Sequence, residues 1–154
     1  MNKNYYGVFI IPLFVMGCSS TQQSQSPNAA VTPQKFNSPH FAELHRFPAR
    51  YPESAVVNAL EGCATLEYVV TPVNEVTEIQ VIATTEQQFA IEAAKVIPKW
   101  QWSALPKGMR NEALKIQTRF EFCLEQPNQR CEAKAATSSC PGEDVIISKG
   151  VRLR

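Results

Sequence analysis

The sequence predicts a small α+β domain in which a three-stranded antiparallel sheet packs against helices, and three observations lead to it. Residues 63–71 and 114–124 alternate apolar and polar side chains, as strands with one buried face do. Residues 76–84 form another strand-like run, which a short turn joins to the first. Residues 85–100 place apolar side chains at helical spacing, and Pro98 limits that helix.

Local signals place the boundaries of the first elements. Pro52 opens a helical pattern, because proline is tolerated at the first helical position, and Gly62 stands where a helix stop is expected. Residues 72–75 form the hairpin connection between the first two strands. Asn74 is suited to a left-handed backbone there. The predicted order is helix, strand, strand, helix, strand.

Chain direction then fixes the sheet. For all strands to be antiparallel, the third must lie beside the first, which gives the spatial order 2-1-3. We expect Cys63 to face Cys123 and Glu67 to face Arg119 in that pairing. A Cys63–Cys123 disulfide would stabilise the fold by about 4 kcal/mol in the chain-entropy model. Trp102 could be a core residue or a partner contact. The expected core comprises Leu66, Tyr68, Phe89, Trp100, Phe120 and Phe122.

The other two cysteines of the domain region bracket a small polar loop. In an exported chain, we expect a disulfide between Cys131 and Cys140, which would contribute about 2.7 kcal/mol. The alternative is a metal site made by Cys63, Cys123, Cys131 and Cys140 together. That alternative is disfavoured because no Cys-x-x-Cys spacing occurs and the compartment is oxidising.

Composition argues against several classes of function. The chain has 15 Lys+Arg against 14 Asp+Glu, so no basic excess exists for binding nucleic acid. Its two histidines, His40 and His45, lack a third metal ligand and are expected to be solvated in a loop. No nucleophile–base pair, Gly-rich phosphate loop or paired-carboxylate pattern occurs in the sequence. We therefore expect a protein without enzymatic activity, metal or cofactor.

The N-terminal residues predict export. Residues 7–17 are apolar but only 11 residues long, whereas crossing a bilayer takes roughly 20, so residues 1–17 are expected to be a signal peptide. Val15-Met16-Gly17-Cys18 resembles the bacterial lipoprotein signal, in which the cysteine is diacylated and becomes the mature N-terminus. Ser19 after it is similar to the signal for export to an outer membrane. An ordinary signal peptide or a short anchor is the alternative.

The remaining chain divides into three parts. Residues 18–39 comprise the lipidated cysteine and a tether rich in Ser, Gln, Asn and Pro, which cannot bury enough surface to fold. The folded domain is expected over residues 40–124. Residues 125–154 form a cysteine-containing C-terminal extension.

An ordered set of short motifs in residues 49–124 resembles the C-terminal domain of the TonB energy-transducer family. The motifs are Tyr51-Pro52, Glu61-Gly62, Ala93-Ala94, Lys99-Trp100 and Arg119-Phe120-Glu121-Phe122. The resemblance implies a periplasmic domain to which an extended segment of an outer-membrane receptor adds as a strand alongside the third strand. The short signal differs from the membrane-spanning helix of family transducers, so the resemblance implies the binding domain and leaves energy transduction open.

The third strand has an unpaired edge, and such an edge can accept an added strand. Arg119 and Glu121 would bias the choice of partner. The alternative is that the chain covers this edge itself, since residues 144–148 are apolar and β-branched and could fold back as a strand. The predicted partner-binding edge comprises Lys115, Gln117, Arg119 and Glu121.

These features together predict a binding module in the periplasm, anchored to a membrane, expected to be the outer one, through Cys18. Its partner would be an outer-membrane receptor or another envelope protein, and a homodimer stays open. The alternative is a structural envelope lipoprotein whose sheet serves self-association or stability alone.

Overall fold

The computed structural model describes residue 41, residues 44–127, 130–134 and 139–152. The predicted signal peptide and tether, including Cys18, and His40 lie outside these residues. Within them, no helix has the length and apolar character needed to cross a membrane. The elements in chain order are α1 (Glu53–Val57), β1 (Gly62–Val70), β2 (Val76–Thr84), α2 (Gln87–Val96), the short 3-10 helices η2 (Ile97–Lys99), η3 (Trp102–Ala104) and η4 (Lys107–Arg110), β3 (Leu114–Glu125) and β4 (Val145–Val151).

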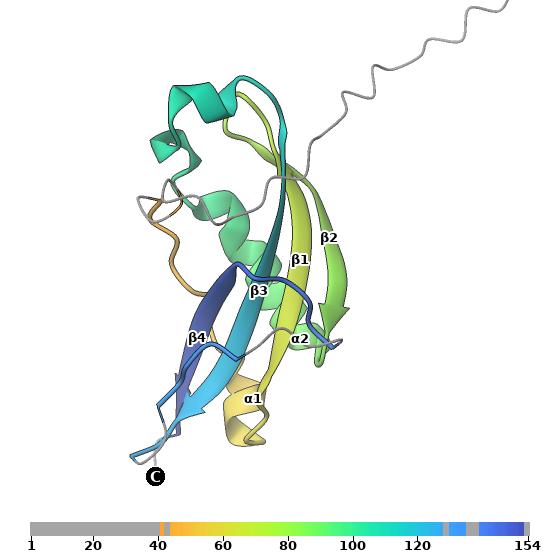
Figure 1. The fold of residues 1–154 in the computed structure, drawn as a ribbon. Helices are drawn as coiled ribbons and strands as arrows, with labels where there is room; N and C mark the ends of the chain where they lie inside the picture. Colours follow the sequence, from red (N-terminus) through yellow and green to blue (C-terminus); the bar gives the residue numbers. More distant parts are fainter. Residues whose placement is uncertain (1–40, 42–43, 128–129, 135–138, 153–154) are drawn as a thin grey trace, which may run out of the picture.

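The four strands form one mixed sheet in the order β2-β1-β3-β4, with α1 and α2 on one face (Figure 1). β1 pairs antiparallel with both β2 and β3, whereas β4 joins β3 in parallel. The prediction of a three-stranded antiparallel sheet is therefore wrong in strand number and in one strand direction. A parallel neighbour needs a connection that crosses the sheet. Here the described parts of that connection, residues 130–134 and 139–144, lie on the face opposite the helices (Figure 1).

The register of β1 and β3 differs by two residues from the predicted one. Cys63 faces Glu121 and Thr65 faces Arg119, so the predicted pairing of Cys63 with Cys123 is wrong. Because side chains alternate with a period of two, a shift of two residues keeps every side chain on its face. The alternation therefore assigned the two faces correctly although it assigned the wrong partners.

α1 is shorter than the helical pattern suggested. Pro52 is its N-cap residue, and the helix ends at Val57. The Asn58 side chain then donates a hydrogen bond to the Ser54 carbonyl (2.8 Å), and Ala59 adopts a left-handed backbone with φ of 53°. These two residues end the helix, so the prediction of a stop at Gly62 is wrong.

Gly62 instead begins β1, at a point where this strand lies close to Thr85, just before α2. A Cβ at this position would lie 2.0 Å from Thr85 Oγ1. That oxygen accepts a hydrogen bond from the backbone N–H of Cys63 (3.0 Å), which fixes the start of β1 against the chain before α2. At the other end of β1, Asn74 has φ of 68°, so the predicted left-handed residue in the hairpin is confirmed.

An aromatic cluster fills the space between the sheet and the helices. Phe89 of α2 stacks on Phe122 of β3 with ring centroids 4.2 Å apart, and Tyr51 packs edge-on against both. Trp100 stacks on Phe120 at 5.8 Å. The side chains predicted for the core are each at most 3% exposed: Leu66, Tyr68, Phe89, Trp100, Phe120 and Phe122.

Trp102 is also a core residue. It is 2% exposed, and its Nε1 donates a hydrogen bond to the Ile97 carbonyl (2.9 Å). Its ring lies 5.7 Å from that of Tyr68. Of the two roles open to Trp102, the structure shows packing.

Candidate partner-binding edge

The edge of β3 that faces away from β1 is divided into two parts. β1 pairs with one side of the strand, whereas β4 pairs with the other side from Arg119 to Glu125. Residues 114–118 of β3 have no strand on that side within the described part of the chain. The chain itself therefore occupies the C-terminal part of the predicted partner-binding edge. Of the two alternatives, an open edge and an edge covered by the chain, this part of β3 shows the second.

Two disulfides hold the connection between β3 and β4 on the outer face of the sheet. Cys63 of β1 is bonded to Cys140, and Cys123 of β3 is bonded to Cys131. Both predicted pairings, Cys63–Cys123 and Cys131–Cys140, are wrong, because each strand cysteine reaches a cysteine of the connection rather than the other strand. The bonds also remove the four-cysteine metal alternative, since metals bind thiolates. Among the described residues, no three His, Cys, Asp or Glu side chains are grouped to hold a metal ion.

Arg119 lies beneath this connection and not on an accessible edge. Its side chain is 3% exposed. Its Nη2 donates a hydrogen bond to the Lys134 carbonyl (2.5 Å) and its Nη1 to the Cys140 carbonyl (3.4 Å). Guanidinium groups suit such forked contacts because their donors point in several fixed directions. Arg119 thus fastens the connection to the sheet.

Glu121 shares this covered site. Its Oε1 lies 3.4 Å from Arg119 Nε. Burial raises the pKa of Glu121 above its ordinary value, an effect larger than the lowering by the positive charges of Arg119 and Lys134. Arg119 and Glu121 are both buried, so neither side chain is accessible to a partner in this structure, and their influence on partner choice stays a prediction.

Lys115 and Gln117 lie in the part of β3 that β4 leaves uncovered. Lys115 Nζ is 2.5 Å from Glu67 Oε1, and the two side chains are 41% and 24% exposed, so water screens the pair only in part. Gln117 is half-buried beside Gly142 of the connection. These two side chains are the accessible remainder of the predicted partner-binding edge.

A chain of polar side chains, here called the Asp144 latch, fixes the start of β4. Asp144 Oδ2 accepts hydrogen bonds from Arg46 Nη1 (2.6 Å) and Thr118 Oγ1 (2.7 Å), and Tyr68 OH lies 2.9 Å from the same Thr118 oxygen. Because Thr118 gives its one hydroxyl proton to Asp144, the Tyr68 hydroxyl donates to Thr118. Burial, the largest effect, raises the pKa of Tyr68. The Asp144 carbonyl also accepts the N–H of Arg119 (2.8 Å).

The latch also binds the N-terminal segment. The Arg46 guanidinium lies over the Trp100 ring, 5.6 Å from its centroid. Trp100 Nε1 in turn donates a hydrogen bond to the Phe47 carbonyl (2.8 Å). The sequence offered no signal for this site, because Arg46 and Asp144 are 98 residues apart in the chain.

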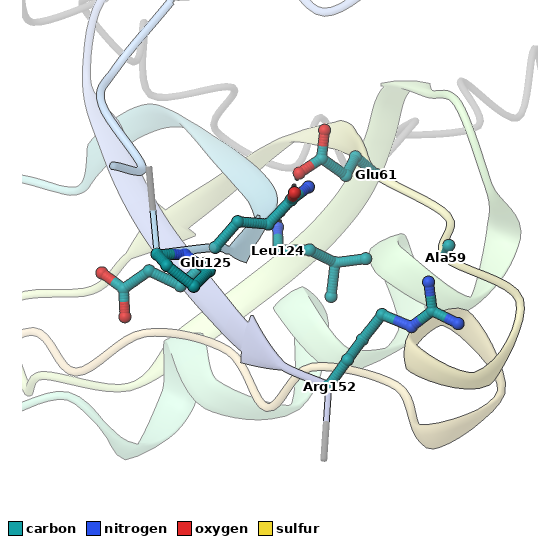
Figure 2. A pocket seen from close by; sticks show the side chains of 7 residues that line it. Ala59, Glu61, Leu124, Glu125 and Arg152 are labelled. Atoms are coloured by element: carbon teal, nitrogen blue, oxygen red, sulfur yellow. Dashed lines mark hydrogen bonds between the residues drawn. The ribbon is translucent and has the colours of Figure 1, made fainter. Parts of the chain in front are cut away.

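A pocket of about 530 Å³ lies where β3 and β4 end, and Figure 2 shows the side chains around it. Its carboxylates are engaged by the fold itself. Glu61 Oε1 accepts the backbone N–H of Leu124 (2.7 Å), and Glu125 pairs with Lys149 (2.7 Å). These two contacts hold the strand ends and engage both carboxylates of the pocket. Its walls comprise Ala59, Glu61, Leu124, Glu125, Gln126, Pro127 and Arg152.

Comparisons with known proteins give one family match and similarity to two solved structures. Residues 48–124 match the family described as Gram-negative bacterial TonB protein C-terminal. The solution structure of Helicobacter pylori TonB-CTD is similar at 20% identity and a TM-score of 0.40, over 49% of this chain and 79% of that chain. The solution structure of Pseudomonas aeruginosa TonB CTD is similar at 18% identity and a TM-score of 0.44, over 63% of this chain and 97% of that chain.

No curated protein matches the chain. The family match covers half of the sequence and ends within β3, so it includes the helices and the first three strands and leaves β4 outside. The matched region includes the aromatic cluster and both of the paired strands β1 and β3. On the strength of that match, this chain belongs to the TonB C-terminal domain family.

Proposed function

We propose that this chain is an exported protein-interaction module of the bacterial envelope, which binds an extended segment of a membrane transport protein by strand addition. The observation that carries the proposal is the added strand on β3, because Arg119–Glu125 pairs with β4 over seven residues. The edge of β3 therefore has the backbone geometry to pair with a parallel strand, and residues 114–118 carry none on that side within the described part of the chain. Main-chain hydrogen bonds would supply affinity and alternate side chains specificity.

Export and anchoring complete the proposal. Two disulfides in a small domain support an oxidising compartment, which for this family is the periplasm. Cys18 would carry the lipid, and residues 18–39 would tether the domain to the membrane, with a reach of about 25 Å for a flexible coil of this length. The module would act by binding, without catalysis or a cofactor.

Residues 114–118 are the first place where a partner segment can pair. They continue the line of the β3 edge beyond the start of β4, and Lys115 and Gln117 lie on their outer face. A ladder of this length is short, since strands usually have about five or six residues and isolated pairs are marginal. Longer pairing with a partner requires β4 to yield.

A structural envelope lipoprotein is the second candidate. The burial of Arg119 and Glu121 favours it, because the chain uses these charges to complete its own fold. In that case the sheet would contribute stability or self-association, and no transport protein would bind.

Photo-crosslinking in cells separates the two candidates. A photoreactive residue in place of Gln117 is compared with the same residue in place of Gln80. Gln80 is an exposed glutamine on β2, the strand at the opposite edge of the sheet. We expect the Gln117 probe, and not the Gln80 probe, to capture a periplasmic segment of an outer-membrane transport protein identified by mass spectrometry. Capture of only a second copy, or of nothing by the exported protein, would favour the structural lipoprotein.

Palmitate labelling tests the anchor separately. The wild-type chain should incorporate the label and a Cys18→Ala variant should not. Absence of label from the wild-type chain would remove the lipid anchor from the proposal and leave the interaction module in place.

A further inference from the structure

We infer that the chain first acquires a mispaired set of disulfides, Cys63–Cys123 with Cys131–Cys140, which a thiol–disulfide isomerase then converts to the native set. The inference goes beyond the proposed function, because it concerns how the domain matures and not what it binds. It starts from the pattern of the native bonds. Four cysteines can pair in three ways, and here the first of the four is bonded to the last and the second to the third.

Loop closure does not select the native set. The native Cys123–Cys131 bond has a sequence separation of 8, and the competing Cys131–Cys140 bond would close a loop only one residue longer. The entropic costs of closing these two loops are therefore nearly equal. The other native bond, Cys63–Cys140, has a separation of 77, whereas a Cys63–Cys123 bond would close a shorter loop. Cys63 can therefore react with the nearer Cys123 before it reacts with Cys140.

The central strand pair brings these two wrong partners close together. Cys63 of β1 faces Glu121 of β3, and Cys123 lies two residues further along β3 on the same face of the sheet. Such diagonal neighbours have Cα atoms about 7–8 Å apart. A disulfide needs Cα atoms about 4.4–6.8 Å apart, so a Cys63–Cys123 bond requires the two strands to shift.

A shift of two residues allows this bond and keeps the sheet intact. Each side chain stays on its face, because side chains alternate with a period of two. Arg119 would then face Glu67 instead of Thr65, which gives a cross-strand pair of opposite charges. The apolar side chains of β3 would still face the helices. The mispaired set can therefore persist as a folded trap.

Contacts of the connection make the native set the more stable product. Arg119 Nη1 donates a hydrogen bond to the Cys140 carbonyl (3.4 Å). Thr65 Oγ1 donates one to the Pro141 carbonyl (2.7 Å). Both contacts need the connection to lie over β1, where the Cys63–Cys140 bond holds it. The four native cysteines are each at most 8% exposed, so the native bonds are protected from further attack by thiols.

The conversion is redox-neutral. The isomerase thiolate attacks the sulfur of Cys63, which breaks the Cys63–Cys123 bond, forms a mixed disulfide and releases the Cys123 thiolate. That thiolate attacks the sulfur of Cys131, which forms the native Cys123–Cys131 bond and releases the Cys140 thiolate. The Cys140 thiolate then attacks Cys63 in the mixed disulfide, which forms the second native bond and returns the isomerase thiolate. Two disulfides of the chain are converted to two others, with no net transfer of electrons or protons.

Oxidative refolding tests the order of pairing. The chain from residue 18 carries Cys18→Ala, which removes the fifth thiol. The reduced, denatured chain is refolded with diamide, an oxidant that carries no thiol; excess diamide is removed, and the product is incubated with or without reduced glutathione. Trypsin cleaves after Arg119, Arg130 and Lys134, so each of the four cysteines lies on its own peptide. Mass spectrometry without reduction then identifies every pairing.

We expect diamide alone to yield mainly the mispaired set, and glutathione to speed the appearance of the native set on the order of tenfold. Two variants in which only one bond is possible are the matched controls: Cys63→Ser with Cys140→Ser, and Cys123→Ser with Cys131→Ser. Each should complete its native bond in diamide alone. The native set as the main product of diamide alone, or the third possible pairing in its place, would overturn the inference.

A chain that keeps only Cys63 and Cys123, with serine in place of the other two cysteines of the domain, tests the shifted register. Diamide should form the bond between them, and nuclear Overhauser contacts across the strands should join Arg119 to Glu67. In the native chain, the same contacts should join Arg119 to Thr65. Free thiols after diamide treatment, or Arg119–Thr65 contacts in the oxidised variant, would reject the folded trap.

This inference and the proposed function fail separately. Capture of a transport protein by the Gln117 probe, together with native pairing in diamide alone, would keep the interaction module and reject the need for an isomerase. The mispaired set in diamide, without cellular capture, would keep the isomerisation and reject the transport partner.

Discussion

The face of the sheet that carries the helices is closed by aromatic packing, whereas the opposite face is closed by two disulfides and a buried arginine. On the helix side, Phe89, Trp100 and Phe122 are each at most 3% exposed and touch other rings. On the outer side, Arg119 bonds to two carbonyls of a connection that the cysteines hold in place. The first face is built mainly from the region that the family match covers, with Phe41 and Leu44 added to its core, whereas the second needs the C-terminal extension and an oxidising compartment.

The largest expected effect comes from removing the disulfides of the outer face. Replacing Cys63 and Cys140 by alanine together should lower the free energy of unfolding by about 4.5 kcal/mol, because the bond closes a long loop with a sequence separation of 77. The same change at Cys123 and Cys131, separated by 8, should cost about 2.6 kcal/mol. Urea unfolding of the two double variants measures the difference. Equal losses would show that loop closure is not the source of the stabilisation.

The second prediction tests the aromatic packing on the helix side of the sheet. Phe122→Ala should lower the free energy of unfolding by about 4 kcal/mol, because it leaves a cavity between Phe89 and Tyr51. Val57→Ala, at a position 70% exposed, is the control and should change it by less than about 0.5 kcal/mol. A loss below about 1 kcal/mol for Phe122→Ala would contradict the view that ring packing closes this face.

The third prediction concerns the junction of the two faces. Asp144→Ala should cost about 2 kcal/mol, because it leaves the hydrogen-bonding groups of Arg46 and Thr118 without their acceptor. Amide exchange in β4 should accelerate with it. The exposed ion pair of Glu92 with Lys95 is the matched control, and Glu92→Ala should cost less than about 0.5 kcal/mol. Unchanged exchange in β4 would show that the latch does not hold that strand.

The smallest expected effect depends on pH. Since burial raises the pKa of Glu121 in the folded chain, the folded state keeps this proton at pH values where the unfolded state has lost it. Stability is therefore lost as pH rises through the folded pKa. Glu121→Gln does not titrate and should raise the free energy of unfolding at pH 7.5, by less than about 1 kcal/mol, and by less still at pH 4.

The control for this pH dependence is Glu112→Gln, at an exposed position of the loop before β3. It should show no such difference between the two pH values. If Glu121→Gln instead destabilised the protein more at pH 7.5 than at pH 4, the attraction to Arg119 would outweigh the burial of the charge.

Local periodicity was enough to predict the helix side. Alternation along β1 and β3 assigns each side chain to a face, and this assignment holds although the register was two residues out. The aromatic positions on α2 follow from helical spacing, and Asn74 from the chemistry of its turn. Each of these depends on neighbours within about ten residues.

The outer side depends on contacts between distant residues. Because β4 is parallel to β3, the chain between these two strands must cross over the sheet. No local sequence pattern predicts the path of that crossover. The disulfide pairing follows from that path and from a register in which Cys63 faces Glu121. The partners of Asp144 are 26 and 98 residues away, so neither could be found from spacing.

The tie between Arg46 and Asp144 joins the N-terminal segment to three strands at once. Asp144 accepts hydrogen bonds from Arg46 and from Thr118 of β3, and the Thr118 hydroxyl contacts Tyr68 of β1. The residue after Asp144 begins β4. A pull on the N-terminal segment would therefore be shared among β1, β3 and β4 and would not load the outermost strand alone.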